Sequence, residues 1–255
     1  MADCLDIALA KGCKLPDDKL ERFRQLCLAA IEQEIALEPR QALGLALGRV
    51  GDPRIIDPRD PAGYVRIPSG RYPFQDGWIE IEEGFALSRY PVTNSQFDRF
   101  IQDGGYQSRA HWSPKGWKWL QKAQVSEPFF YHDRLYDAPN QPVVGVSWWE
   151  AAARGSKARE YPWDGPWEDG ICNTWESRLG TTSPVGLFPR SRQADFGLED
   201  LAGNVWEWVS GERLLRGGSW GDGARIARAA FRYDRHPDFR SDLIGFRVLL
   251  SLRQH

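Results

Sequence analysis

Gly203-Asn204-Val205-Trp206-Glu207-Trp208 is the first of three short motifs that lie between Ala202 and Val248. The other two are Arg216-Gly217-Gly218-Ser219-Trp220 and Ile244-Gly245-Phe246-Arg247. Glycines beside tryptophans let the backbone pack closely under large rings, so such motifs can fix loops that lack regular secondary structure. With 25 Gly, 17 Pro and 12 Trp in 255 residues, the chain is predicted to contain a loop-rich α+β domain held by aromatic side chains.

The size and charge of the chain limit its domains and its partners. A chain of 255 residues suffices for one full-sized domain and a small appendage. The formal net charge is −2, so there is no basic excess that would favour a polyanionic partner. We therefore expect a protein or small-molecule ligand, with no nucleic acid and no membrane.

The N-terminus and the cysteines predict a cytoplasmic protein. No stretch stays apolar for the length of a bilayer span, and the first fifteen residues mix acidic with basic side chains, unlike a secretory signal. The four cysteines show no CxxC pairing and no metal-ligand spacing, so we interpret them as free thiols: Cys4, Cys13, Cys27 and Cys172.

The N-terminal fifty residues have the periodicity of a helical hairpin. Between Pro16 and Glu38, apolar residues recur at three- and four-residue steps, as in an amphipathic helix: Leu20, Phe23, Leu26, Ala30, Ile31 and Ile35. A second helix is predicted over Pro39–Val50, with Gly51 at its end. Because 51–63 is rich in proline and charge, we assign residues 1–57 to the hairpin and linker and 58–255 to the main domain.

The start of the main domain has clearer local signals than its remainder. Strands are predicted over 64–68, 78–82 and 85–90. A helix begins at Thr93 or Asn94, presents Phe97, Phe100 and Ile101 on one face, and ends at Gly104-Gly105.

Several further motifs occur in a characteristic order before the three quoted first: 64–70, 90–94, 142–148, 153–155, 161–163 and 182–186. In this order the set resembles the formylglycine-generating-enzyme (sulfatase-modifying factor) family. The resemblance implies an α+β, C-type lectin fold of the formylglycine-generating-enzyme type, loop-rich, with an N-terminal helical hairpin. The hairpin looks like a segment that precedes this domain in some bacterial signalling ATPases. This likeness lies in residues 42–54, and the chain has no GxxxxGK[ST] phosphate loop. The hairpin is therefore expected either to dock a signalling-protein partner or to be a remnant.

The family's catalytic chemistry has no matching residues here. Its enzymes use two cysteines after the RGGS motif, at places that correspond to about Asp222 and Ala227, and no cysteine follows Cys172. The related sulfoxide synthases take iron from histidines on an N-terminal helical bundle. This chain has only His111, His132, His236 and His255, none of them in the hairpin. We therefore predict a protein that is not an enzyme; the alternative is an active or degenerate formylglycine-generating-type oxidase.

A second resemblance is to the variable proteins of diversity-generating retroelements, which display a hypervariable ligand-binding face. Their variable segment runs from an RGGSW motif to an IGFR motif, and both are present here. The positions that resemble the fixed residues between them are Arg228, Arg232, Pro237, Asp238 and Arg240. Adenine mutagenesis of AAC codons cannot produce Lys, Glu, Gln, Met or Trp. None of these occurs in 221–244, where their frequency elsewhere would give roughly five.

We call residues 221–243 the recognition segment. Its predicted ligand-binding residues combine rigid aromatic area with adaptable polar groups: Gly221, Asp222, Gly223, Arg225, Ile226, Phe231, Tyr233, Asp234, Arg235, His236, Phe239, Ser241, Asp242 and Leu243. The alternative for Phe231, Phe239 and Leu243 is that they are core residues.

The family resemblance also implies structural calcium. Asp200, the carbonyl groups of Gly203 and Val205, and Glu207 match one calcium-binding loop of the family, and these are the oxygen ligands that calcium requires. A looser match is Asn173 and Thr174 with the Leu179 carbonyl. The alternative for Glu207 is that it holds a loop by hydrogen bonds.

Overall fold

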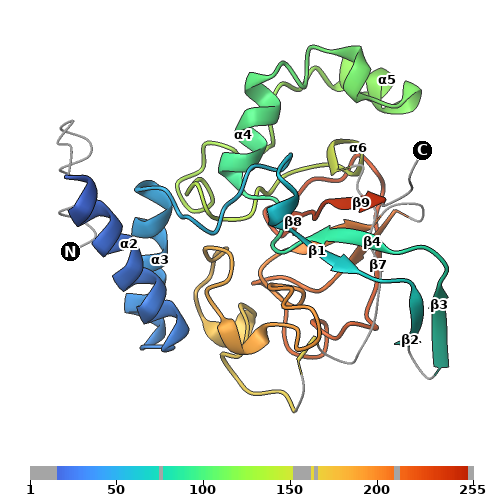
Figure 1. Ribbon diagram of the computed structural model, residues 1–255. Coiled ribbons are helices and arrows are strands. Elements are labelled where there is room, and N and C mark those ends of the chain that lie inside the picture. Colours follow the sequence, from blue (N-terminus) through green and yellow to red (C-terminus); the bar gives the residue numbers. More distant parts are fainter. Residues whose placement is uncertain (1–15, 75–76, 152–161, 164–165, 210–212, 252–255) are drawn as a thin grey trace.

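The computed structural model describes residues 16–74, 77–151, 162–163, 166–209 and 213–251 (Figure 1). The α-helices are α2 Asp17–Glu32, α3 Leu37–Arg49, α4 Asn94–Gln102, α5 Pro114–Ala123 and α6 Trp148–Ala151. The strands are β1 Tyr64–Ile67, β2 Gly70–Phe74, β3 Gly77–Ile81, β4 Phe85–Ser88, β5 Trp206–Val209, β6 Leu214–Arg216, β7 Tyr233–Asp234, β8 Ile244–Gly245 and β9 Leu249–Ser251. Short 3₁₀ turns lie at 61–63, 109–111, 175–177 and 189–191.

The N-terminal hairpin is confirmed, with two corrections to its first helix. Helix α2 ends at Glu32, because the chain turns through Glu34 (φ +50°) into α3, so the helix does not continue to Glu38. Leu26 does not belong to the buried stripe: it is 60% exposed, whereas Cys27 and Ile31 are 1% exposed. Neighbouring helix positions lie about 100° apart, so Leu26 points away from the face that holds Cys27.

The hairpin packs against the main domain and does not stand apart from it. Its buried side chains form one cluster with Leu187 and Phe188. Helix α3 approaches the main domain closely at Gly44, because this residue has no Cβ. A Cβ there would lie 3.0 Å from the side chains of Pro184 and Leu187. Polar contacts complete the junction: the Asn140 amide donates to the Gly44 carbonyl at 2.9 Å. The hairpin and the main domain therefore share a continuous interior.

Three small sheets make up the strand structure. The first has the order β1-β4-β9 and is antiparallel, so β4 near the start of the domain lies beside the C-terminal strand (Figure 1). The second is the β2–β3 hairpin. The third has the order β7-β6-β5-β8, in which only the β5–β8 pair is parallel. The predicted strands at 64–68, 78–82 and 85–90 correspond to β1, β3 and β4.

Tryptophan side chains hold the loops between these elements, as the composition predicted. The largest buried cluster contains Trp112, Trp206 and Trp208. Their ring N–H groups bond loop carbonyls: Trp112 Nε1 donates to Gly105 O at 2.7 Å, and Trp208 Nε1 to Val146 O at 3.0 Å. Each ring thus fills the core and also satisfies an irregular backbone segment.

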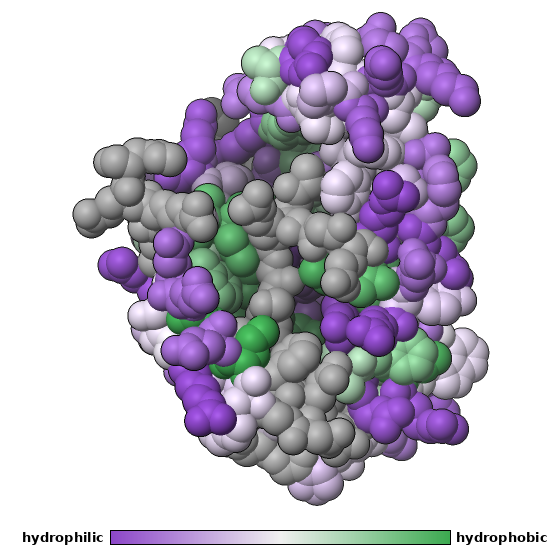
Figure 2. Space-filling view, turned by 90° about the vertical axis from the view of Figure 1, so that its right-hand side faces the viewer, coloured by the Kyte–Doolittle hydropathy of each residue, from purple (hydrophilic) through white to green (hydrophobic). Residues whose placement is uncertain are grey.

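The surface is mixed in character. On the side shown in Figure 2, hydrophilic residues gather at the height of α5, and hydrophobic residues alternate with hydrophilic ones below it. Within the described part of the chain, no helix combines the length and the apolar character needed to cross a membrane.

Arg247 joins three distant segments at the centre of the domain. Its side chain is 3% exposed, and Nη2 lies 2.9 Å from Glu207 Oε1. Nη1 donates to the carbonyls of Ser88 and Arg89 at 2.9 and 2.6 Å, and Nη2 donates to the carbonyl of Glu199 at 2.6 Å. One guanidinium therefore connects β4, the loop before β5, and β5 itself.

Replacement of Arg247 is expected to destabilise the whole domain. Arg247→Leu leaves the Glu207 carboxylate and three carbonyls without their donor, which should lower the free energy of unfolding by about 3–5 kcal/mol. Arg247→Lys keeps the charge but not the forked geometry, so its free energy of unfolding should lie between those of the wild type and Arg247→Leu. Urea denaturation measures both. Arg66→Leu, at an exposed position on β1, is the control and should stay within about 0.5 kcal/mol of the wild type. A loss below about 1 kcal/mol for Arg247→Leu would contradict this role.

Two glycines with similar positive φ angles provide a second test. Gly203 has φ +74° and Gly180 has φ +67°. A Cβ on Gly203 would lie 2.4 Å from the Asn173 carbonyl oxygen, whereas a Cβ on Gly180 meets nothing within 4 Å. Gly180→Ala should cost about 1 kcal/mol for the left-handed backbone, and Gly203→Ala at least about 2 kcal/mol more because of the clash. Equal thermal stability of the two variants would show that the contact at Asn173 is not tight.

Candidate functional site

The recognition segment is fixed at both ends by backbone hydrogen bonds to β5 and the loop before it. Trp220 N donates to Asn204 O at 3.1 Å, and Trp206 N donates to Leu243 O at 2.7 Å. Between these ends, Tyr233 and Asp234 form β7, which pairs with β6. The segment thus begins beside the loop before β5 and ends beside β5 itself, and both anchoring residues, Asn204 and Trp206, belong to the first quoted motif.

Most of the positions that resemble fixed residues of the variable proteins contact the rest of the domain. We call the rest of the domain the scaffold. Arg240 Nε donates to Gly145 O at 2.6 Å, and its Nη2 lies 3.2 Å from Oε1 of the fully buried carboxylate of Glu150. The Pro237 carbonyl accepts from Trp148 N at 2.9 Å. Asp238 Oδ1 accepts from Trp149 Nε1 at 2.8 Å. Arg228 bonds the Arg225 carbonyl within the segment, and Arg232 is exposed, so neither has such a contact with the scaffold residues that the structure describes.

The predicted ligand-binding residues divide by exposure into two sets. The exposed set is Gly221, Arg225, Tyr233, Asp234, His236 and Phe239. The half-buried set is Asp222, Gly223, Ile226, Phe231, Arg235, Ser241, Asp242 and Leu243. Three of the half-buried residues, Ile226, Phe231 and Leu243, pack against the main core, so the core alternative describes Phe231 and Leu243 in part. Phe239, at 41% exposure, does not fit that alternative.

Two carboxylates in the half-buried set serve the scaffold. Asp222 accepts hydrogen bonds from the backbone N–H of Ser219 at 3.0 Å and from its hydroxyl. Asp242 Oδ2 accepts from the Tyr136 hydroxyl at 2.9 Å. Burial, reinforced by this bond, raises the pKa of Tyr136, so the phenol remains a donor at neutral pH. These contacts shape the segment and leave the carboxylates less free for a ligand.

Four side chains at β7 form a stack that reaches the surface. The rings of Trp206 and Tyr233 lie 6.0 Å apart at 25°, and the Arg235 guanidinium lies 3.6 Å from the Tyr233 centroid. The same guanidinium lies 5.3 Å from the Phe239 centroid. We call Trp206, Tyr233, Arg235 and Phe239 the aromatic–arginine ladder. Trp206 is buried, so the ladder leads from the core to solvent.

The carboxylates predicted to bind calcium already have protein partners. Asp200 Oδ2 accepts from Gly186 N at 2.6 Å, and burial raises the pKa of Asp200 to about 7. Both Glu207 oxygens face the Arg247 guanidinium. As arranged, Glu207 does not fit as a calcium ligand, because a buried cation already neutralises it. The geometry favours the alternative in which Glu207 holds a loop, and calcium stays a prediction.

The residues of the looser calcium-site match lie in or beside a buried network of amide hydrogen bonds. Asn173 Nδ2 donates to Thr181 O at 3.0 Å and to Asn204 Oδ1 at 3.2 Å, and Asn204 N donates to Asn173 O at 2.7 Å. Asn204 also bonds the Ser183 backbone in both directions. Thr174 is buried beside Asn173, and Leu179 packs on the hairpin cluster. The structure thus brings the two predicted calcium segments together through Asn204, which the sequence reasoning did not single out.

Two described residues relevant to oxidase chemistry, Ala227 and Cys172, are buried together. Ala227, at the place of a family cysteine, is fully buried in a cluster with Cys172. Burial raises the pKa of Cys27 to about 11 and also raises that of Cys172, so both thiols stay protonated. Among the described residues, no three His, Cys, Asp or Glu side chains are grouped to hold a metal ion.

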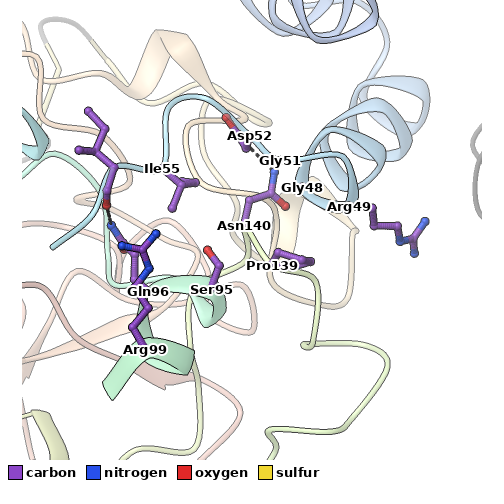
Figure 3. Close-up of a pocket in the computed structure, with 11 residues that line it drawn as sticks. Gly48, Arg49, Gly51, Asp52, Ile55, Ser95, Gln96, Arg99, Pro139 and Asn140 are labelled. Carbon is purple, nitrogen blue, oxygen red and sulfur yellow. Dashed lines mark hydrogen bonds between the residues drawn. The ribbon is translucent and has the colours of Figure 1, made fainter. Parts of the chain in front are cut away.

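A cavity of about 290 Å³ lies at the junction of the hairpin and the main domain (Figure 3). Asn140 and Asp52 line it and bond each other at 2.9 Å, and Gln96 Nε2 donates to Ile56 O at 2.7 Å. Figure 3 shows Arg49 and Arg99 on opposite sides of it. None of the predicted site residues lines this cavity, which no sequence motif indicated.

Residues 57–252 match the family described as sulfatase-modifying factor enzyme 1-like domain. The chain is 26% identical over 272 residues to a hercynine oxygenase of Mycolicibacterium smegmatis, covering 83% of this chain and 60% of the oxygenase. It is 28% identical over 274 residues to the inactive C-alpha-formylglycine-generating enzyme 2 of Mus musculus, covering 76% and 87%. The chain therefore spans less than two thirds of the oxygenase.

Two solved structures share the fold. PvdO from Pseudomonas aeruginosa has a TM-score of 0.52 and 22% identity, and Treponema denticola variable protein 1 has a TM-score of 0.50 and 15% identity. Each comparison covers 74% of this chain and 94% of the other. These likenesses confirm the predicted α+β architecture. The chain belongs to the sulfatase-modifying factor enzyme 1-like family and has the C-type lectin fold of the formylglycine-generating-enzyme type.

Proposed function

We propose that this chain is a non-catalytic ligand-binding protein whose recognition segment is diversified by a retroelement. One observation carries the proposal. Of the positions that resemble fixed residues, Pro237, Asp238 and Arg240 contact the scaffold, whereas Tyr233 and Phe239, which resemble variable residues, project to solvent. A segment built in this way can change its outward side chains without losing its backbone position.

The comparisons support the proposal without deciding it. The fold occurs in a variable protein, and the family includes a protein described as an inactive formylglycine-generating enzyme. Other relatives are enzymes, so the oxidase alternative rests on their names. Diversification itself requires an adenine-substituted copy of this segment and a reverse-transcriptase gene beside the gene.

The proposal also includes a cytoplasmic location and a signalling protein that binds the hairpin. The unpaired thiols of Cys27 and Cys172 favour a reducing compartment, which supports a cytoplasmic protein. A signalling partner at the hairpin would use the outward face that includes Leu26, because the inward face is covered by Leu187 and Phe188.

A combined change of outward side chains tests the recognition segment. In the variant Arg225→Ser, Asp234→Ser, His236→Ser, Phe239→Ser, the free energy of unfolding should fall by no more than about 2 kcal/mol, because each site is exposed. The control is Ile244→Ser, at a position that is 2% exposed; it should cost more than about 3 kcal/mol. If the fourfold variant is as unstable as the control, the segment is part of the core and the proposal fails.

The oxidase alternative is tested by oxygen consumption. With a cysteine-containing peptide and added copper, the purified chain should consume oxygen no faster than Cys172→Ala, because the Cys172 thiol is buried and protonated. Peptide-dependent turnover above that of the variant would establish an enzyme and overturn the proposal.

A further inference from the structure

The recognition segment is nearly neutral in sequence but presents an excess of positive charge. Residues 221–243 contain five arginines and four aspartates. Three aspartates accept hydrogen bonds from scaffold groups: Asp222 from Ser219, Asp238 from Trp149 and Asp242 from Tyr136. Hydrogen bonding to the scaffold thus engages three of the four carboxylates; Asp222 and Asp242 are half-buried, whereas Asp238 stays exposed.

The arginines behave differently. Arg240 is the member that pairs with a carboxylate, that of Glu150. The other four have no carboxylate within ion-pair distance among the residues that the structure describes: Arg225, Arg228, Arg232 and Arg235. Asp234 and Asp238 are the exposed acids of the segment, and Asp238 also accepts a hydrogen bond from Trp149. Within this segment, the unmatched charge is therefore mainly guanidinium.

Arg235 is the arginine held most firmly for recognition. The ring of Tyr233, 3.6 Å away, and that of Phe239, 5.3 Å away, limit the positions of its guanidinium. A guanidinium lying over a ring keeps its N–H edge available, and that edge matches the two oxygens of a carboxylate. Holding the side chain in advance reduces the entropy lost on binding.

The same geometry argues against nucleobases as the ligand. Base stacking needs an open aromatic face. Tyr233 has Trp206 stacked at 25° and Arg235 as its other close neighbour, so its ring is already engaged. The half-exposed edges of Tyr233 and Phe239 suit apolar contact with a peptide beside the guanidinium.

We propose that the aromatic–arginine ladder binds an acidic peptide segment of a partner protein, with Arg235 engaging an Asp or Glu carboxylate. This proposal rests on the function proposed above and adds the chemistry of the partner. The unmatched arginines nearby favour association with an acidic surface, and that attraction should weaken with salt.

Selection of peptides tests the ladder. The full chain is used to select from a random dodecapeptide display library, and the selected peptides are synthesised with Asp and Glu or with Asn and Gln. The carboxylate forms should bind at least about tenfold more tightly, and Arg235→Lys, which loses the fork, should weaken their binding about tenfold or more. The matched control Arg66→Lys on β1 should change binding by less than about twofold.

Three results would overturn the ladder proposal: no selected peptide, equal binding of the amide forms, or tighter binding of a twelve-nucleotide single-stranded DNA than of the peptides. Thermal denaturation of Arg235→Lys shows whether any loss of binding is a loss of folding. The proposed function is judged separately by the fourfold variant and by oxygen consumption. If the fourfold variant stays folded but the chain shows no preference for carboxylate peptides, the ladder proposal alone is rejected and the proposed function stands.

Discussion

The buried guanidinium of Arg247 is the contact on which the loop-rich domain depends. A charge with 3% side-chain exposure carries a large desolvation cost, and this cost is offset only because Glu207 neutralises it and three carbonyls accept its remaining donors. The partners come from segments more than a hundred residues apart in sequence. Since the sheets are small, this hydrogen-bonded centre and the tryptophan N–H bonds supply the order that long strands supply in other folds.

The order at the centre extends to both ends of the recognition segment. Ile244 on β8 lies three residues from Arg247 and pairs in parallel with β5. At the other end, Trp220 N bonds Asn204, whose side chain belongs to the network with Asn173 and Ser183. A segment whose ends are fixed to two buried polar networks can keep its path while its middle changes. This is the physical requirement for a surface that varies.

Local signals predicted the elements that have a period or a cap. Helix α4 follows Thr93, whose N–H donates to Gln96, and shows an apolar face at Phe97. Helix α5 has a comparable start at Ser113, whose hydroxyl accepts from Gly116 N, and it buries Leu120, but the sequence analysis predicts no helix there. Strands β7 and β8 are two residues long, too short for any alternation, so tertiary pairing alone creates them.

In the candidate site, too, some features follow from local sequence and others depend on tertiary contacts. The anchoring motifs marked its limits in the sequence, but no local rule distinguishes Phe231, which packs on Trp206, from Phe239, which is 41% exposed. The sequence also does not show which acidic side chains bond the scaffold, because that depends on whether a donor such as Tyr136 reaches them from another segment.

These internal contacts restrict which positions can vary freely. A change at Asp242 would leave the Tyr136 hydroxyl without its acceptor, and a change at Asp222 would release the turn at Ser219. Either change carries a stability cost of about 1–3 kcal/mol before any ligand is considered. A change at Asp234 or His236 carries little cost, because both are exposed. Under the proposed function, diversity that preserves folding is therefore expected to concentrate around β7, where the outward side chains and the aromatic–arginine ladder lie together.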